Sequence, residues 1–271
     1  MARSTEWLKK VDSYLTQLAD EKDMVRASEM FHKHLDTMSK FWHYSRHNQI
    51  LVMLQMPEAT LIAGYHKWKK MGRYVRKGEK ALRILAPGKA KKQDEDVDDP
   101  NVRVIRYFFP VSVFDVTQTD GDDLDVLGMD IVGDEAKAYF DALIAHCKEN
   151  GTEVKYESMG FGQYGASSNG SITIAEGGSH NTQFATAVHE MAHELLHWDG
   201  EKQTKLRVET EAESVAYVVL SHYGLETKAP EYLAIYNPDK KMLEASLGNI
   251  SAVAKQIITA IESKLVREEV A

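Results

Sequence analysis

The chain has 271 residues, of which 33 are Lys or Arg, 41 are Asp or Glu and 43% are hydrophobic, with a formal net charge of −8. This length suits two modest domains that each bury a core. The single cysteine, Cys147, excludes an internal disulfide, and no run approaches the ~20 apolar residues of a membrane span. We therefore expect a cytoplasmic protein with no signal peptide and no membrane partner.

The N-terminal part of the chain predicts helices followed by a small mixed sheet. Apolar residues recur at helical spacing in three segments: Ser4–Ala19, Val25–Met38 and Tyr44–Gln55. Short strands are expected at Tyr74–Val75, Ala81–Leu85, Val102–Phe109 and Val111–Val116. The segment Thr119–Gly133 is rich in Asp and Gly and predicts a linker, so the first domain is expected at residues 1–122.

The C-terminal part predicts a second α+β domain, at residues 134–271. It opens with a helix at Glu135–Lys148 and closes with a helix at Asn249–Arg267. Strands are expected between them, at Glu153–Glu157, Gln163–Ser167 and Ser171–Ala175. Ser168, Asn169 and Gly170 are typical of a hairpin turn. A strand beside a catalytic helix could hold an extended peptide by backbone pairing, and we expect Ser171–Ala175 to do so.

One short motif carries most of the chemistry in this sequence. His189 and His193 are four residues apart in an apolar helical stretch, so both imidazoles share one face about one turn (~5.4 Å) apart. Glu190 follows the first histidine, where it can reach a water on a bound metal. This HExxH pattern predicts a zinc-dependent hydrolase with Glu190 as general base. Asn181 or Thr182 is expected to cap the helix.

The motif is doubled, because His193, Glu194 and His197 repeat the same spacing. His189 and His197 lie ~12 Å apart along a helix, so both registers cannot bind one ion in the same way. We favour the first register. His197 is then expected to cap the end of the helix or to support the site without binding the metal.

The third ligand is expected on a second helix, which runs from about Arg207 to a stop at Gly224. Glu209 and Glu213 are four residues apart and share a face, whereas Glu211 points elsewhere. In a helix hairpin, one of the two carboxylates would bind zinc and the other would accept a ring N–H from a histidine. The spacing alone leaves open which does which, and solvation of all three is the common alternative.

These motifs resemble the zincin peptidase domain of ArdC-type antirestriction proteins and their ImmA/IrrE relatives. The resemblance runs over roughly residues 150 to 225 and includes the Glu-x-Glu-Ala-Glu stretch after the HExxH helix. It implies a zincin-like fold with one Zn2+ ion and water as the fourth ligand. It also implies that His189, His193 and Glu209 bind the metal, with Glu213 supporting a histidine.

The first part of the chain resembles the N-terminal single-stranded-DNA-binding domain of ArdC-type proteins. The resemblance rests on blocks in the same order, which begin at Tyr44, Pro57, Gly64, Gly72 and Val113. Independently, the segment from Leu61 to Lys92 holds eleven Lys or Arg against one acid, with aromatic residues among them. Basic groups follow phosphates and aromatic faces stack on unpaired bases, but a solvated lysine face over a core tryptophan is an equally good interpretation of composition alone. The candidate DNA contacts are Arg46, Asn48, Tyr65, Lys67, Trp68, Lys69, Lys70, Arg73, Arg76, Lys77 and Lys80.

Together these features predict a DNA-associated zinc metallopeptidase that acts on an unknown protein substrate. The resemblance implies a role in antirestriction when plasmid or phage DNA enters a cell. Two alternatives remain at this stage. The chain could be a DNA-binding protein with structural zinc, which protects DNA sterically, or a regulatory peptidase that cleaves a repressor, as ImmA/IrrE relatives do.

Overall fold

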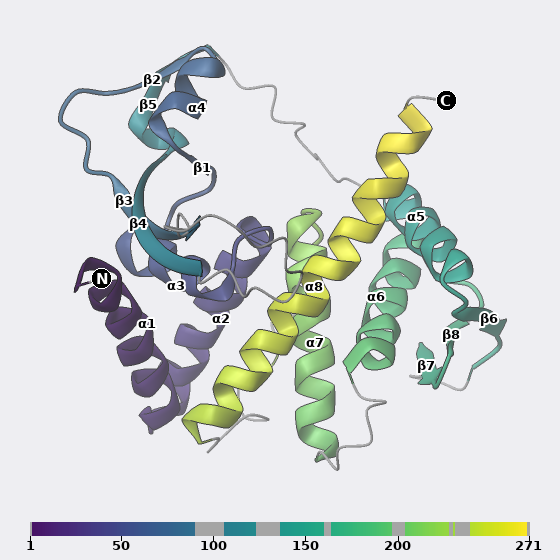
Figure 1. The fold of residues 1–271 in the computed structure, drawn as a ribbon. Coiled ribbons are helices and arrows are strands. Elements are labelled where there is room, and N and C mark those ends of the chain that lie inside the picture. The colour runs from purple at the N-terminus through teal and green to yellow at the C-terminus, as the bar shows by residue number, and fades with distance from the viewer. Residues whose placement is uncertain are drawn as a thin grey trace, which may run out of the picture. The chain divides into compact units, whose positions relative to one another are not determined.

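The computed structural model describes residues 2–89, 106–122, 136–159, 164–196, 204–227, 230 and 239–269 (Figure 1). The fold combines helices with three small sheets, which confirms the expected α+β class. The chain forms two compact units. The first consists of Met1–Tyr14 and His47–Leu124, and the second of Leu15–Arg46 and Asp125–Ala271. None of the described helices combines the length and apolar character needed to cross a membrane.

The first unit is built around a long two-stranded ribbon. Its strands are β3 (Leu82–Lys89) and β4 (Arg106–Asp115), and the short strand β1 (Ile62–Ala63) pairs with the other edge of β4. Strands β2 (Arg73–Val75) and β5 (Thr119–Gly121) form a second small sheet beside helix α4 (Tyr65–Lys70). A 3-10 turn, η1 (Val116–Gln118), joins β4 to β5. The expected linker therefore begins later than Thr119, because its first three residues pair with β2.

Strand β4 runs without a break through Pro110, where two separate strands were expected. Pro110 lies opposite Leu85, whose backbone N–H and C=O both bond to the Asn48 side chain and so point away from β4. This pair is therefore a non-hydrogen-bonded one, and the nitrogen of Pro110 faces the other edge. Partner strand β1 reaches only Phe114 and Asp115, so the missing N–H costs no ladder bond.

Helix α3 (Arg46–Gln55) protects the free edge of β3 with two amide side chains. Asn48 donates to Leu85 O at 2.9 Å and accepts from Leu85 N at 2.8 Å, and Gln55 bonds Arg83 in the same two-way pattern at 2.9 Å in both directions. These bonds replace those that a neighbouring strand would make at Arg83 and Leu85, so this part of the edge is not open to pairing with another chain.

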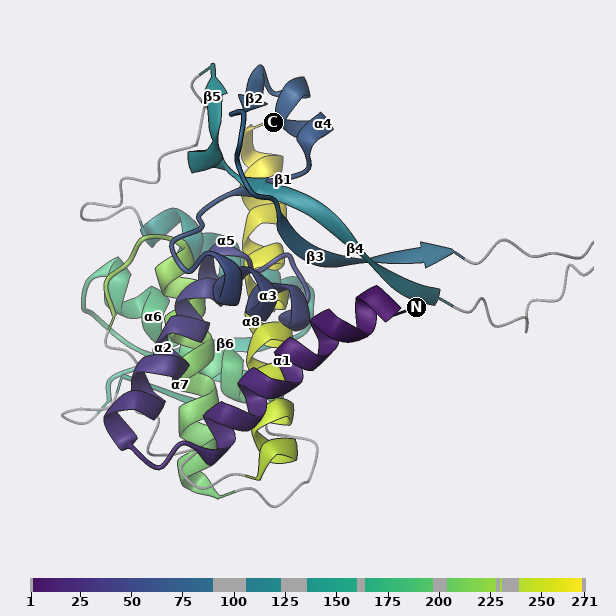
Figure 2. The same ribbon diagram turned by 90° about the vertical axis from the view of Figure 1, so that its left-hand side faces the viewer.

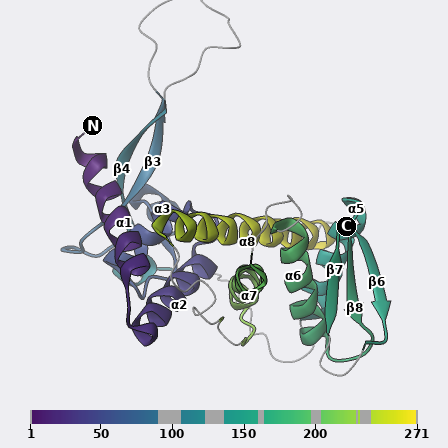
Figure 3. The same ribbon diagram turned by 90° about the horizontal axis from the view of Figure 1, so that it is seen from below.

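The second unit is a helical bundle with one sheet. The helices are α2 (Met24–Lys40), α5 (Ala136–Glu149), α6 (His180–Leu196), α7 (Lys205–His222) and α8 (Lys240–Glu269). Helix α8 packs on α5, α6 and α7, and α6 packs on α7. Figure 3 shows the sheet β6-β8-β7 beside α6. Cys147 of α5 is buried, and burial raises the pKa of its thiol to about 11.

Helix α2 lies in the second unit, although the expected first domain, residues 1–122, includes it. Its Asp36 accepts a hydrogen bond of 2.6 Å from Tyr217 of α7, and Trp42, just after α2, makes an edge-on contact with His222 at 5.7 Å between ring centroids. The compact units are therefore not continuous along the chain, in contrast to the expected boundaries at 1–122 and 134–271.

The sheet of the second unit matches its predicted strands closely. Strand β6 (Glu153–Glu157) is parallel to β8 (Ser171–Ala175), which is antiparallel to β7 (Gly165–Ser168). Ser168 pairs with Ser171, so Asn169 and Gly170 form the predicted two-residue turn, with a φ of 86° at Gly170. Because β8 is central, both of its edges are paired, and the edge nearest α6 is β7.

His34 of α2 makes the free energy of unfolding depend on pH. Burial, and secondarily the charge of Arg46, lowers the pKa of this imidazole from 6.5 to about 3, so it stays neutral in the folded protein. The unfolded chain binds this proton below pH 6.5, so stability falls as the pH falls from 6.5 toward 3. We expect a loss of about 1.4 kcal/mol from this group between pH 7.5 and 5.5. Urea unfolding at the two pH values measures it, and His34→Leu should show a correspondingly smaller drop. Equal drops in both proteins would contradict the assignment.

Candidate metal centre

Helix α6 carries the two histidines of the HExxH motif on one face. Its opposite face, with Phe184, Val188 and Ala192, is buried in the bundle, and this fixes the rotation of the helix. The helix begins at His180, one residue before the predicted cap. Ser179 caps it, because its hydroxyl accepts from the Thr182 N–H at 3.2 Å.

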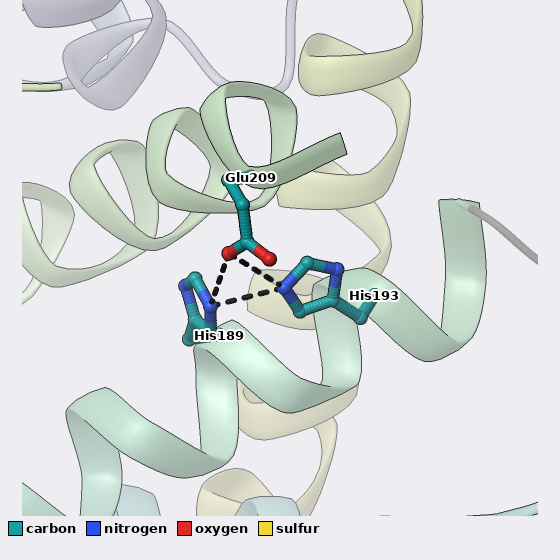
Figure 4. A group of neighbouring side chains, drawn as sticks. All are labelled: His189, His193 and Glu209. Carbon is teal, nitrogen blue, oxygen red and sulfur yellow. Dashed lines mark hydrogen bonds and ion pairs between the residues drawn. The ribbon is translucent and has the colours of Figure 1, made fainter. Parts of the chain in front are cut away.

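The predicted ligands converge at one point (Figure 4). The Nε2 atoms of His189 and His193 are 3.0 Å apart, and the Oε2 atom of Glu209, on α7, lies 3.6 Å from the first and 3.4 Å from the second. Among the described residues, these three form the one group of His, Cys, Asp or Glu side chains arranged to hold a metal ion. Two ligand atoms of a tetrahedral zinc ion lie about 3.3 Å apart, so the triangle fits such an ion.

The electrostatics of the site suit a cation. Burial, with help from His193, lowers the pKa of His189 even though Glu209 opposes the shift, so the imidazole is neutral and its lone pair is free to bind metal. The side chain of Glu209 is 42% exposed, compared with 12% for His193. The triangle is therefore open to solvent on the side of Glu209, where a fourth ligand could enter.

Glu190 is buried beside this triangle and faces the sheet. Burial, followed by the negative charge of Glu209, raises the pKa of its carboxyl to about 7, while a hydrogen bond from the Ser167 hydroxyl of β7 works in the other direction. A carboxyl with a pKa near neutrality can both accept and return a proton. Ser167 was not among the predicted site residues, and the sequence held no signal for it beyond its place in a predicted strand.

Strand β7 approaches α6 so closely that Gly165 has no room for a side chain. A Cβ atom there would lie 2.5 Å from Cγ2 of Thr186 and 2.7 Å from Oε1 of Glu190. Gly165→Ala should therefore push β7 away from Glu190 and destabilise the protein by about 1–3 kcal/mol, as measured by urea unfolding. Gly248→Ala, in α8, is the matched control. Its nearest neighbour is 3.9 Å away, so a stability equal to wild type or higher is expected. A Gly165→Ala protein as stable as wild type would refute the close approach.

The three glutamates of α7 have separate environments. Thr204 caps the helix, which was not predicted. Glu209 faces the histidines, as the expected helix hairpin requires. Glu211, which was expected to point elsewhere, is completely buried. Its Oε1 accepts from Arg207 Nε at 2.8 Å and from Ser246 Oγ of α8 at 2.5 Å, so it ties α7 to α8. Glu213 is exposed, and its role beside a histidine stays a prediction.

In the second HExxH register, the glutamate contacts the sheet and does not join the ligand triangle. Glu194 accepts a hydrogen bond of 2.6 Å from the backbone N–H of Gly170, and so holds the turn between β7 and β8 against α6. His197 lies outside the described residues. The geometry of His189, His193 and Glu209 supports the first register. The expected substrate strand, β8, has both edges paired, so it cannot accept a peptide, and β7 takes its place as the strand next to Glu190.

The predicted DNA contacts divide into buried and exposed groups. Trp68 is completely buried and its indole N–H donates to Phe114 O at 2.9 Å, so its ring cannot stack on a base. Asn48 is buried on the edge of β3, as described above. Arg46 is half-buried and donates to Glu244 O of α8. The structure thus gives these three side chains internal roles instead of the expected surface roles.

Two further arginines bond within the first unit. Arg73 donates twice to Thr119, at 2.8 and 3.0 Å, and so links β2 to β5. Arg76 is paired with Glu79 at 2.9 Å and with Asp120 at 3.2 Å, which neutralises much of its charge. The remaining candidates are exposed on this unit, as a DNA-binding role requires: Tyr65, Lys67, Lys69, Lys70, Lys77 and Lys80.

The chain resembles known proteins both in the sequence of its N-terminal part and in its fold. Residues 15–114 match the family described as the N-terminal domain of anti-restriction factor ArdC. Two crystal structures of the antirestriction ArdC protein from the R388 plasmid share the fold at 19% identity. The metal-free structure has a TM-score of 0.52 and covers 81% of this chain and 86% of that chain, and the Mn(II)-bound structure has a TM-score of 0.53 and covers 82% and 84%.

A curated relative extends further than this chain. An uncharacterized protein of Bacillus anthracis, pXO2-81, is 25% identical over 283 residues, which cover 84% of this chain and 47% of the relative. The chain thus spans about half the length of that protein. Residues 15–114 therefore belong to the ArdC N-terminal domain family, and the chain shares its fold with the antirestriction ArdC protein.

Proposed function

We propose that this protein is a zinc-dependent peptidase that associates with single-stranded DNA and protects incoming mobile DNA from restriction. The triangle of His189, His193 and Glu209, with Glu190 buried beside it, is the observation that carries the proposal. In this assignment the expected domain at residues 1–122 binds DNA and the expected domain at 134–271 is the peptidase. We place the protein in the cytoplasm, because a chain with one buried cysteine suits a reducing compartment.

The ligand set favours a catalytic over a structural metal. Structural zinc sites are usually closed by four protein ligands, whereas catalytic sites have three and leave one position open. The described residues supply two imidazole nitrogens and one carboxylate oxygen, which is a typical catalytic set. A solved ArdC structure contains Mn(II), so manganese is the second metal to test. We propose zinc because it prefers two histidines with one carboxylate.

The side chains of the site suggest how a peptide would be cleaved. The ion, once bound, would supply Lewis acidity toward a water and the scissile carbonyl. Glu190 takes the proton from the attacking water and returns it to the leaving amine, a task that suits its raised pKa. Ser167 orients the Glu190 carboxyl, and the edge of β7 pairs with the extended peptide backbone.

Peptide hydrolysis under metal control tests the proposal. The purified chain is loaded with Zn(II), or separately with Mn(II), and incubated with a library of unstructured peptides, and new N-termini are identified by mass spectrometry. We expect cleavage that a chelator removes and the metal restores, and binding of a fluorescent oligodeoxythymidine that weakens steeply with salt. Cleavage that survives the chelator would contradict the metal assignment, and absence of oligonucleotide binding at low salt would contradict the DNA assignment.

A further inference from the structure

The ribbon of β3 and β4 carries large aromatic side chains on its outer part. Tyr107 is 50% exposed, Phe108 53% and Phe109 40%, although residues of this kind are normally buried. Figures 2 and 3 show the two strands extending outward past α3, with the N-terminal end of α1 (Ala2–Asp20) beside them. Contiguous exposed aromatics of this size usually mark a surface that binds a partner.

Alternation along β4 sorts these rings between the two faces of the ribbon. Tyr107 and Phe109 share one face, and Phe108 lies on the other. The first face continues inward through Leu82, Ile84 and Val113, which are buried. The same face therefore changes from core to exposed aromatic surface along the ribbon, and Tyr107 and Phe109, hereafter the ring pair, are its exposed end.

The ring pair is held in place by the strand opposite it. Tyr107 pairs with Gly88, and a Cβ atom at Gly88 would lie 2.6 Å from the Tyr107 ring, so the ring lies against the glycine backbone. The two ring centroids are 6.1 Å apart, with an interplanar angle of 44°. Because Gly88 has no side chain, the Tyr107 ring can pack directly on its backbone. The ring pair exposes two aromatic surfaces to solvent, at the ~6.7 Å spacing of alternate strand residues.

The unit that carries the ring pair also exposes basic side chains. Arg83 of β3 is exposed, and Asp115, the one acid in the described part of β3 and β4, is completely buried. The same unit exposes a further set of lysines on α4 and the segment after β2: Lys67, Lys69, Lys70, Lys77 and Lys80. Unpaired bases stack on aromatic residues of sheets while nearby cations follow the phosphates, and duplex DNA offers no free base faces.

We propose that Tyr107 and Phe109 form a base-stacking site for single-stranded DNA, and this rests on the DNA association proposed above. The site takes over the stacking role that the sequence suggested for Trp68, which is buried. Sequence inspection overlooked the ring pair because it lies in an expected strand, where aromatic residues are ordinarily core.

Binding of a fluorescent oligodeoxythymidine, followed by anisotropy over a range of salt concentrations, tests the site. The double variant Tyr107→Leu/Phe109→Leu keeps apolar strand residues but removes both rings, and should bind roughly 30-fold more weakly. Phe108→Leu is the matched control, with similar exposure on the opposite face, and should bind like wild type. Because stacking involves no ion release, the double variant should keep the wild-type salt slope.

Each alternative gives a different result. If wild type and the double variant bind the oligonucleotide equally well, the stacking site is wrong and the DNA association stands. Wild type that fails to bind at low salt would overturn both. If the double variant instead loses self-association in sedimentation, with unchanged DNA affinity, the rings contact a second copy of the chain and the proposal is wrong. Equal melting temperatures of the variants establish that the comparison concerns folded proteins.

Discussion

Replacement of Glu209 by Gln is expected to lower the affinity of the chain for Zn(II) or Mn(II) by on the order of 100-fold or more. The substitution keeps the shape of the side chain but removes the charge of the carboxylate that lies within 3.6 Å of both imidazoles. Loss of a residue that only supports a ligand already costs about 10–100-fold in metal affinity, and a direct ligand should cost at least as much. Calorimetric titration and elemental analysis of the purified protein measure the change.

Two further Glu→Gln variants provide the comparisons needed to interpret the loss of metal affinity. Glu226→Gln removes one negative charge from an exposed position after α7 and should leave the metal affinity within a few-fold of wild type. Glu213→Gln should have an intermediate effect if Glu213 supports a histidine. If Glu213→Gln loses the metal and Glu209→Gln retains it, the roles of the two glutamates are reversed.

The metal site could be predicted from sequence because its geometry is mostly local. His189 and His193 share one helix, and the helix period alone places their rings together. Glu209 requires one further step, a short hairpin between two amphipathic helices. Glu211 lay beyond such reasoning, because its burial depends on Ser246 of α8, which is 35 residues away in the chain. The i,i+4 pairing of Arg207 with Glu211 was the available signal.

The residues of the proposed DNA-binding surface were harder to predict, because composition does not reveal which side of an element a residue faces. Trp68 lies among exposed lysines in the sequence, but the short helix α4 turns its ring into the core and its indole N–H toward β4. Asn48 was expected on the surface, but its position depends on the unpaired edge of β3, which no local pattern shows. In both cases tertiary contacts, not local propensity, decide the role of the residue.

The proposed protection of DNA could come from cleavage of a protein or from coverage of the strand, and Glu190→Gln separates the two. Glu190 is not among the three converging ligands, so the variant should keep its metal. Hydrolysis should fall by about 10²–10⁴-fold, because the amide cannot accept the proton from water. Peptide cleavage and metal content are measured on the same preparation, and cleavage at the wild-type rate would refute the role of Glu190.

The same variant has a second, independent signature in its stability. The pKa of Glu190 is raised from 4.5 to about 7 in the folded protein, so its ionisation destabilises the fold as the pH rises through this range. Without metal, Glu190→Gln should therefore be more stable than wild type at pH 8, by about 1–3 kcal/mol, and similar to it at pH 4.5. A buried carboxylate that costs stability is understandable where it serves catalysis. If Glu190→Gln protects incoming DNA as well as wild type does, the proposed protection is steric and does not depend on hydrolysis.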